Sequence, residues 1–191
     1  MFLHRGTLTK MLKQAYKDGL KIAMDNGWLY LAGLYWEASI KSDFVPKETL
    51  GEIIKLTGAL PGEGEKWECT ADGNQTEMPI DTTINPDNYR MGPLTITDTL
   101  QIGTKGTIQR FVQDESTGVI YLINNVFVNL VDKKNIEYDK GEYEPGDPMY
   151  SAYGVLWQNN VCRLKAHFRT DEKNNKIMES LKGVDITPEV P

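Results

Sequence analysis

The sequence predicts an α+β fold: a mostly antiparallel sheet of hairpins with three short helices. Apolar residues repeat with helical spacing in three short segments only, and much of the remaining chain alternates between apolar and polar residues. Turn sequences, rather than crossover helices, connect the strand-like segments, which favours antiparallel neighbours over βαβ units. With 191 residues, 40% of them hydrophobic and 25% charged, the chain can form one ordinary domain or two small ones.

Each of the three predicted helices has a start and a stop signal. The first covers residues 8–18, with Thr7 as its N-cap and Gly19 at its end. The second covers residues 46–57, starts with Pro46 in its first turn and ends before Gly58. A third short helix near the C-terminus is expected after Thr170, with Ile177, Met178 and Leu181 on its apolar face and Gly183 at its end.

Residues 20–40 contain two apolar runs separated by Asp25-Asn26-Gly27. Asn-Gly is typical of a tight turn with positive φ angles, so we expect a β-hairpin here. Four large aromatic residues lie in this segment: Trp28, Tyr30, Tyr35 and Trp36. We expect them to pack in the core, and the alternative is a platform on which nucleic-acid bases stack.

The chain divides by composition into three parts. Residues 1–60 are predicted to form a helix–hairpin–helix unit, and residues 61–92 a polar connector that holds a short hairpin near Asp72-Gly73. Residues 93–191 are predicted to form an antiparallel β-rich region followed by the C-terminal helix. Within this region we expect strands from residue 93 to residue 131 and a solvated acidic loop at residues 137–147.

The stretch "VCRLKAHFRT", residues 161–170, places a basic side chain at every second position. We expect a hairpin over residues 150–169 in which Asn159-Asn160 forms the turn and Gln158 pairs with Val161. One face of this hairpin is then apolar. The other presents a row of basic residues, which we call the basic row: Arg163, Lys165, His167 and Arg169.

The basic row has two interpretations. Its side chains stand roughly 6–7 Å apart, close to the phosphate spacing of an extended strand, so it suits RNA, DNA or an acidic protein surface. Alternatively, it is a solvated sheet face that the acidic loop partly neutralises. The net charge of −6 disfavours non-specific nucleic-acid binding but permits a local basic face. The candidate binding residues are Lys10, Lys13, Lys17, Arg163, Lys165, His167 and Arg169.

We assign no catalytic residue from the sequence. His167 is a weak candidate for a general base in RNA cleavage, with His4, Tyr150 or Lys165 as a possible acid, but no spacing rule supports any of these pairs. Cys162 is expected to pack in the apolar face. The two cysteines and two histidines are too far apart to match a metal-ligand spacing, and the glycine-rich stretches do not match a phosphate-binding loop, so no metal or cofactor is predicted.

No apolar stretch approaches the ~18–20 residues that a membrane span requires, so no membrane partner is expected. The first residues also lack the pattern of a signal peptide. Because the chain has only two cysteines, Cys69 and Cys162, a disulfide framework is not expected. We therefore predict a cytoplasmic protein.

The N-terminal third resembles a known group of proteins. Residues 5–31, "RGTLTKMLKQAYKDGLKIAMDNGWLYL", and residues 45–65, "VPKETLGEIIKLTGALPGEGE", resemble small uncharacterised proteins of phages and integrative elements of Firmicutes, a group that includes anti-CRISPR inhibitors. The resemblance implies a cytoplasmic protein of a mobile element that targets host defence machinery. Our first interpretation is a non-enzymatic binding or inhibitor protein that acts on a host protein or ribonucleoprotein. The alternatives are an RNA-cleaving or RNA-binding enzyme centred on residues 163–169, and a structural accessory protein.

Overall fold

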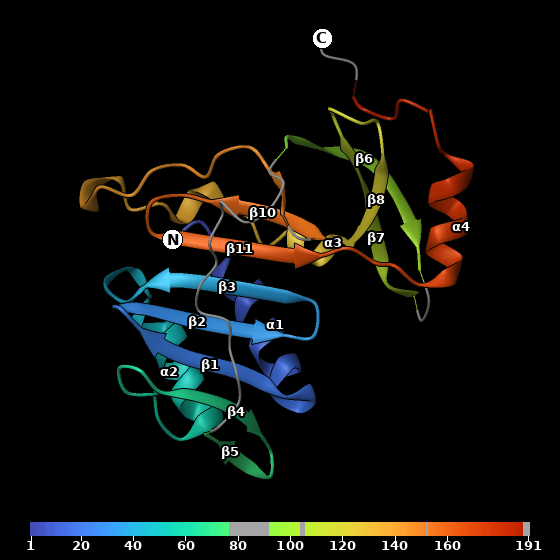
Figure 1. The fold of residues 1–191 in the computed structure, drawn as a ribbon. Helices are drawn as coiled ribbons and strands as arrows, with labels where there is room; N and C mark the ends of the chain where they lie inside the picture. Colours follow the sequence, from blue (N-terminus) through green and yellow to red (C-terminus); the bar gives the residue numbers. More distant parts are fainter. Residues whose placement is uncertain (77–91, 104–105, 152, 189–191) are drawn as a thin grey trace. The chain divides into compact units, whose positions relative to one another are not determined.

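The computed structural model describes residues 1–76, 92–103, 106–151 and 153–188, and confirms the predicted α+β class (Figure 1). The chain forms two compact units, and neither is continuous in sequence. Unit 1 consists of residues 1–84, 130–145 and 158–164, and unit 2 of residues 85–129, 146–157 and 165–191. None of the helices among these described residues is both long enough and apolar enough to cross a bilayer.

Unit 1 is built on an antiparallel sheet in which β5, β4, β1, β2 and β3 lie side by side and β11 follows β3. Its strands and helices are α1 (Arg5–Asp18), β1 (Leu20–Asp25), β2 (Trp28–Gly33), β3 (Trp36–Lys41), α2 (Lys47–Thr57), β4 (Lys66–Thr70), β5 (Gly73–Gln75) and the first residues of β11 (Cys162–His167). Strands β4 and β5 form the short hairpin expected in the polar connector; the rest of the connector, from residue 77 to residue 91, lies outside the described residues.

The first two predicted helices are confirmed, with small changes at their ends. Helix α1 starts three residues earlier than expected because His4, not Thr7, is its N-cap: the backbone N–H of Thr7 donates to His4 Nδ1 at 3.1 Å. Gly19 ends α1 with a φ of 106°, and Gly58 ends α2 with a φ of 82°. Glycine adopts this left-handed backbone without the steric penalty that other residues incur.

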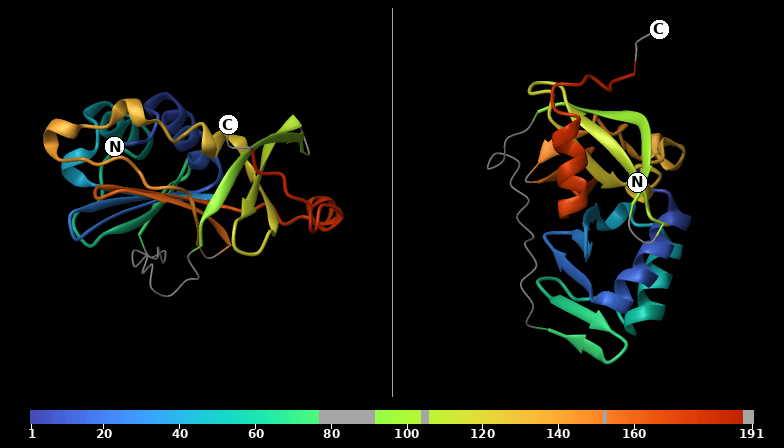
Figure 2. Two further views of the ribbon diagram at one scale, coloured as in Figure 1. Left: turned by 90° about the horizontal axis from the view of Figure 1, so that it is seen from above. Right: turned by 90° about the vertical axis from the view of Figure 1, so that its right-hand side faces the viewer.

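Both helices cover the same face of the unit 1 sheet (Figure 2). The side chains of β2 alternate between the two faces of the sheet, and the buried Leu29 and Leu31 lie on the face that the helices cover. A Cβ atom on Gly33, two residues further along the same face, would lie 3.1 Å from the Cβ atom of Ala15 in α1. We call the other side of the sheet, which points away from α1 and α2, the open face.

The predicted turn at Asn26-Gly27 is confirmed. Both residues have positive φ angles, 50° and 72°, as a type I′ turn requires. The turn pairs Asp25 with Trp28 and joins β1 to β2. The segment goes on to form a third strand, β3, because the chain reverses again at residues 34–35, and Gly33 then pairs with Trp36.

Residues 130–145 hold the start of the chain within unit 1. Leu3 forms a β-bridge with Val131, and the Met1 amino group lies 2.7 Å from Glu142 Oε2. Glu142 is only 1% exposed and also accepts the backbone N–H of Glu137 at 2.9 Å. The expectation that the whole acidic loop is solvated is therefore wrong for Glu142, whose carboxylate is buried and satisfied by hydrogen bonds.

Unit 2 contains a three-stranded antiparallel sheet in the order β6-β7-β8. Its elements are β6 (Leu94–Ile102), β7 (Ile108–Asp114), β8 (Ile120–Asn124), α3 (Asn125–Val128), β9 (Met149–Ser151), most of β10 (Gly154–Gln158), the end of β11 and α4 (Glu172–Ser180). The expected strand up to residue 131 ends early, because Asn124 caps α3 by accepting the Val126 N–H at 3.0 Å.

The predicted C-terminal helix is α4, which packs against the unit 2 sheet. Its apolar face contacts a buried cluster of Phe111, Ile120 and Leu122. The residues that it contributes are those predicted from the sequence: Ile177, Met178 and Leu181. Asp171 rather than Thr170 is its N-cap, because the Asp171 carboxylate accepts the Asn174 N–H at 3.1 Å.

The hairpin of β10 and β11 is present, but its turn is shifted by one residue. The Asn159 N–H donates to the Cys162 carbonyl oxygen at 2.9 Å, so the turn residues are 160–161. The Asn159 side chain forces this by accepting the N–H groups of Val161 and Cys162 at 3.0 and 2.7 Å. The predicted pairing of Gln158 with Val161 is therefore wrong. The shift changes the register by two residues, so the apolar face is preserved.

Candidate anion-binding site on the open face of unit 1

The open face of the unit 1 sheet brings an aromatic ring and two cations together. We define the tryptophan site by five residues from three neighbouring strands: Trp28 and Tyr30 on β2, Ser39 and Lys41 on β3, and Arg163 on β11. Trp28 and Tyr30 are half-buried, and Lys41 is exposed. The expectation that all four aromatic residues of this segment pack in the core is therefore correct only for Trp36, which is 5% exposed.

The pairing of the strands places these side chains on one face. Trp28 pairs with Lys41, and Tyr30 pairs with Ser39. Paired residues in an antiparallel sheet point to the same side, and alternate residues share that side. Since Leu29 and Leu31 face the helices, Trp28, Tyr30 and their partners face away from them. The type I′ turn thus fixes which aromatic side chains lie outside the core.

Two cations lie near the Trp28 ring. The Arg163 Cζ atom lies 5.1 Å from the ring centroid, and the Lys41 Nζ atom lies 5.7 Å from it. Both distances fall within the range of ~6 Å in which the ring quadrupole attracts a cation. No residue in the described part of the chain forms an ion pair with Lys41 or Arg163. An external anion can therefore pair with both cations, in competition with the negative charge of Asp25, which pairs with Trp28 on the same face.

Backbone hydrogen bonding places Arg163 next to Ser39. The Lys41 N–H donates to the Val161 carbonyl oxygen at 2.8 Å, and β3 and β11 run in opposite directions (Figure 1). In an antiparallel pair, the residue two positions before Lys41 then lies opposite the residue two positions after Val161. These residues are Ser39 and Arg163, so their side chains are neighbours on the open face.

Ser39 has an unusual environment for a hydroxyl group. Its side chain is fully buried, with 0% exposure, and its Oγ atom has no hydrogen-bond partner among the residues that the structure describes. A buried hydroxyl without a partner costs about 1–3 kcal/mol. Such groups are rare in folded proteins, and this one lies on the same face as the two flanking cations. It provides an unused donor and acceptor inside the tryptophan site.

Tyr30 adds a second hydroxyl to the site. Burial raises the pKa of Tyr30, the negative charge of Asp25 raises it further, and the positive charge of Arg163 opposes this shift. Tyr30 therefore stays protonated at neutral pH and can donate a hydrogen bond. The neighbouring acidic group also shows that the open face as a whole is mixed in charge, so the basic surplus is local to Lys41 and Arg163.

The structure distributes the predicted binding residues over three places. Arg163 belongs to the tryptophan site, and the burial of Cys162, Leu164 and Ala166 confirms that the basic and apolar residues of β11 alternate. Lys165 and His167 are half-exposed on the same side of β11 as Arg163, and each makes interactions of its own. The basic row ends there, because the Arg169 N–H donates to the Leu122 carbonyl oxygen beyond β11.

The basic side chains of α1 lie on the helix layer, on the other side of the unit 1 sheet from Trp28. Lys10, Lys13 and Lys17 are all exposed there, and Lys13 forms an ion pair of 3.0 Å with Glu52 of α2. One compact ligand therefore cannot contact α1 and Arg163 through a single patch. The α1 lysines and Arg163 therefore belong to separate surfaces of unit 1.

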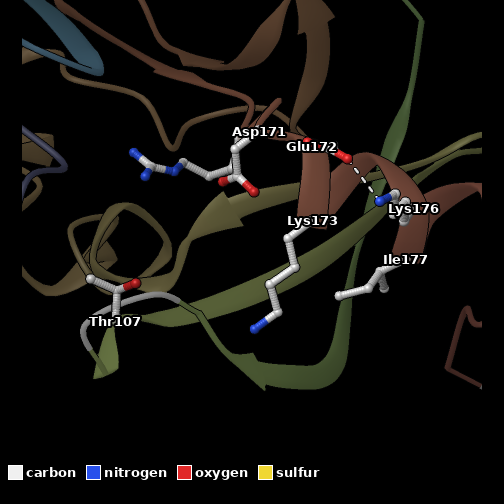
Figure 3. A pocket seen from close by; sticks show the side chains of 7 residues that line it. Thr107, Asp171, Glu172, Lys173, Lys176 and Ile177 are labelled. Carbon is white, nitrogen blue, oxygen red and sulfur yellow. Dashed lines mark hydrogen bonds and ion pairs between the residues drawn. The ribbon is translucent and has the colours of Figure 1, made fainter.

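Arg169 lines a pocket in unit 2 at the start of α4 (Figure 3). The pocket has a volume of about 890 Å³ and is open to solvent. Its charges are mixed: Glu172 and Lys176 form an ion pair of 2.7 Å, and Asp171 is engaged in capping the helix. Figure 3 shows Lys173 extending from α4 on the side of Thr107. The pocket contains both signs of charge and no aromatic ring.

Other candidate chemical groups have structural roles. His4 caps α1, and the thiols of Cys69 and Cys162 are buried, with no exposed surface. Burial raises the pKa of Cys69 to about 11 and raises the pKa of Cys162 as well, so neither thiol is a reactive thiolate at neutral pH. Within the described ranges, no group of three His, Cys, Asp or Glu side chains is arranged to hold a metal ion.

Sequence reasoning missed Ser39 and Lys41, and it named Trp28 and Tyr30 only in the alternative of a base-stacking platform. A signal for Trp28 was present: once Asn26-Gly27 is the turn, strict alternation puts Trp28 and Tyr30 on the opposite face from Leu29 and Leu31.

Comparison of the chain with models of protein families and with curated proteins finds no match.

Proposed function

We propose that this chain is a non-enzymatic binding protein that recognises an anionic macromolecule through the tryptophan site. The observation that carries the proposal is that Arg163 and Lys41 lie 5.1 and 5.7 Å from the Trp28 ring centroid and that, among the described residues, neither cation forms an ion pair. Cations held close together without counter-charges repel each other, and a bound anion relieves that repulsion. The resemblance of residues 5–65 makes a host ribonucleoprotein the partner class to test first.

Reversing the charges of two lysines of α1, Lys10 and Lys17, provides a matched control for this proposal. Lys10 and Lys17 are exposed on the helix layer, so reversing both changes the net charge by the same amount as reversing Lys41 and Arg163. The two double variants differ only in the surface that they alter. Heparin, a polyanion without aromatic rings, reports on the charge component alone.

The test compares the salt dependence of heparin binding for the wild type and the two variants. Lys41→Glu with Arg163→Glu is expected to weaken binding and to reduce the slope of log K against log salt by roughly 2, since about one counterion is released per contact. Lys10→Glu with Lys17→Glu is expected to leave most of the slope in place. Equal losses in the two variants would refute a localised site, and an unchanged affinity and slope in the first variant would refute the proposal itself.

The cleavage hypothesis for His167 remains a prediction. Replacement of His167 by alanine is expected to leave heparin binding unchanged, because His167 lies outside the tryptophan site. If the chain cleaves RNA through this residue, the same variant stops cleavage and retains binding. The two activities are therefore separable in one protein preparation.

A further inference from the structure

We propose that the anionic ligand is single-stranded nucleic acid and that one of its bases stacks on Trp28 in the place that the Arg163 guanidinium now occupies. This inference rests on the proposed function and specifies its ligand. Three features of the tryptophan site support it: the ring with the Arg163 guanidinium over it, the Ser39 hydroxyl without a partner among the described residues, and the absence of an ion pair at Lys41 and Arg163 in that part of the chain.

The guanidinium of Arg163 occupies the position that a base would take. It is planar, it lies 5.1 Å from the ring centroid, and no carboxylate of the described residues fixes it there. A cation–π contact at a partly exposed site corresponds to roughly a two- to fivefold population ratio. Stacking of one base on an aromatic side chain corresponds to about 5- to 150-fold in Kd. A base therefore competes favourably for the ring.

Displacement of Arg163 also explains the hydroxyl of Ser39. Ser39 lies opposite Arg163 across the β3–β11 pair, is fully buried and has no hydrogen-bond partner within the described part of the chain. When the Arg163 side chain moves from the ring to a phosphate, the space next to Ser39 opens. The hydroxyl can then donate to, or accept from, the edge of the stacked base. The ligand supplies the partner that the free protein lacks.

Other classes of polyanion do not match all three features. An acidic peptide would pair with Lys41 and Arg163 through its carboxylates, but the negative face of the Trp28 ring repels a carboxylate, so the ring would add nothing to binding. In a duplex both faces of each base are already stacked, so exposing one face costs a few kcal/mol of unstacking. A single strand presents phosphates and base faces together, which is what a ring next to two cations can bind.

The experiment measures binding of three probes to the whole chain by fluorescence anisotropy. The probes are a single-stranded 12-mer of deoxythymidine, an abasic 12-mer with the same phosphates, and a duplex of the same length. We expect the deoxythymidine strand to bind about 5- to 150-fold more tightly than the abasic strand. Binding of the deoxythymidine strand should also quench the fluorescence of Trp28, one of four tryptophans in the chain.

Two variants identify the stacking residue. Trp28→Leu keeps an apolar side chain on the half-buried surface, and it should abolish the preference for bases and the quench while retaining the weaker abasic binding. Tyr143→Leu is the matched control, because Tyr143 is an aromatic residue of unit 1 that is 68% exposed and lies outside the site. It should bind all three probes as the wild type does.

The outcomes separate this inference from the proposed function. If the deoxythymidine and abasic strands bind equally, or if Trp28→Leu keeps the preference for bases, base stacking is refuted while anion binding by Lys41 and Arg163 stands. If the duplex binds as tightly as the single strand, the ligand class is refuted. If none of the probes binds and heparin binding is also lost, the proposed function fails together with the inference.

Discussion

Removing the Ser39 hydroxyl should stabilise the free protein. In Ser39→Ala the buried oxygen without a hydrogen-bond partner disappears, which relieves a cost of about 1–3 kcal/mol. The loss of a few van der Waals contacts and the lower strand preference of alanine offset part of this gain. We therefore expect the free energy of unfolding to rise by about 1 kcal/mol.

Thr57 provides a control with the opposite sign. It is also buried, with 8% exposure, but its Oγ1 atom lies 2.9 Å from the Ile53 carbonyl oxygen and 2.6 Å from that of Ala59. Thr57→Val keeps the shape of the side chain and removes a hydroxyl that is hydrogen-bonded, which should cost about 1 kcal/mol. Deleting a hydroxyl from each site thus gives opposite changes in stability.

Thermal unfolding followed by circular dichroism measures both changes. At about 2–4 °C per kcal/mol for a chain of this size, the melting temperatures of the two variants should differ by roughly 4–8 °C. If Ser39→Ala is destabilised by as much as Thr57→Val, the Ser39 hydroxyl is hydrogen-bonded in the free protein and the reasoning is refuted. Ser39→Ala should also bind the single-stranded probe more weakly, which a purely structural hydroxyl would not cause.

Two further predictions concern unit 2. Gly154→Ala should lower the free energy of unfolding by about 1–3 kcal/mol in a urea titration, because its new Cβ atom would collide with the backbone of Ala166; Gly146→Ala, where a Cβ atom meets no neighbour within 4 Å, is the control. Burial raises the pKa of Asp114, but hydrogen bonds from Ser116 and Thr117 outweigh it and hold the pKa below its ordinary value of 3.8. The stabilisation by this carboxylate is complete above pH 3.8 and is lost as the pH falls through the lower folded-state pKa; Asp114→Asn, which keeps an acceptor oxygen and does not titrate, should show a shallower loss of stability between pH 5 and 2.

The local elements were predictable because their signals are short-range. Gly19 and Gly58 end the first two helices, and Asn26-Gly27 turns the first hairpin, as the sequence indicates. Errors occurred where a side chain captured a backbone group that a pattern does not specify. Asn124 stops β8 by capping α3, and Asn159 moves the β10–β11 turn by accepting two backbone N–H groups.

The site was harder to predict because it depends on pairing between distant segments. The basic strand and the aromatic hairpin were both identified, yet their combination requires β11 to lie beside β3. That neighbour relation is not encoded in the spacing of either segment. Charge patterning alone grouped Arg163 with the lysines of α1, whereas the two surfaces lie on different sides of the unit 1 sheet.

The interleaved order of the two units has a consequence for synthesis on the ribosome. Strand β3 receives its neighbour only when residues 161–164 have been made, and the chain grows at about 5–20 residues per second. Until then the edge of β3 is unpaired and Trp28 lacks the arginine that lies over it. Nascent chains and prematurely terminated products therefore carry no complete tryptophan site, and ligand binding is confined to molecules whose translation has passed Arg163.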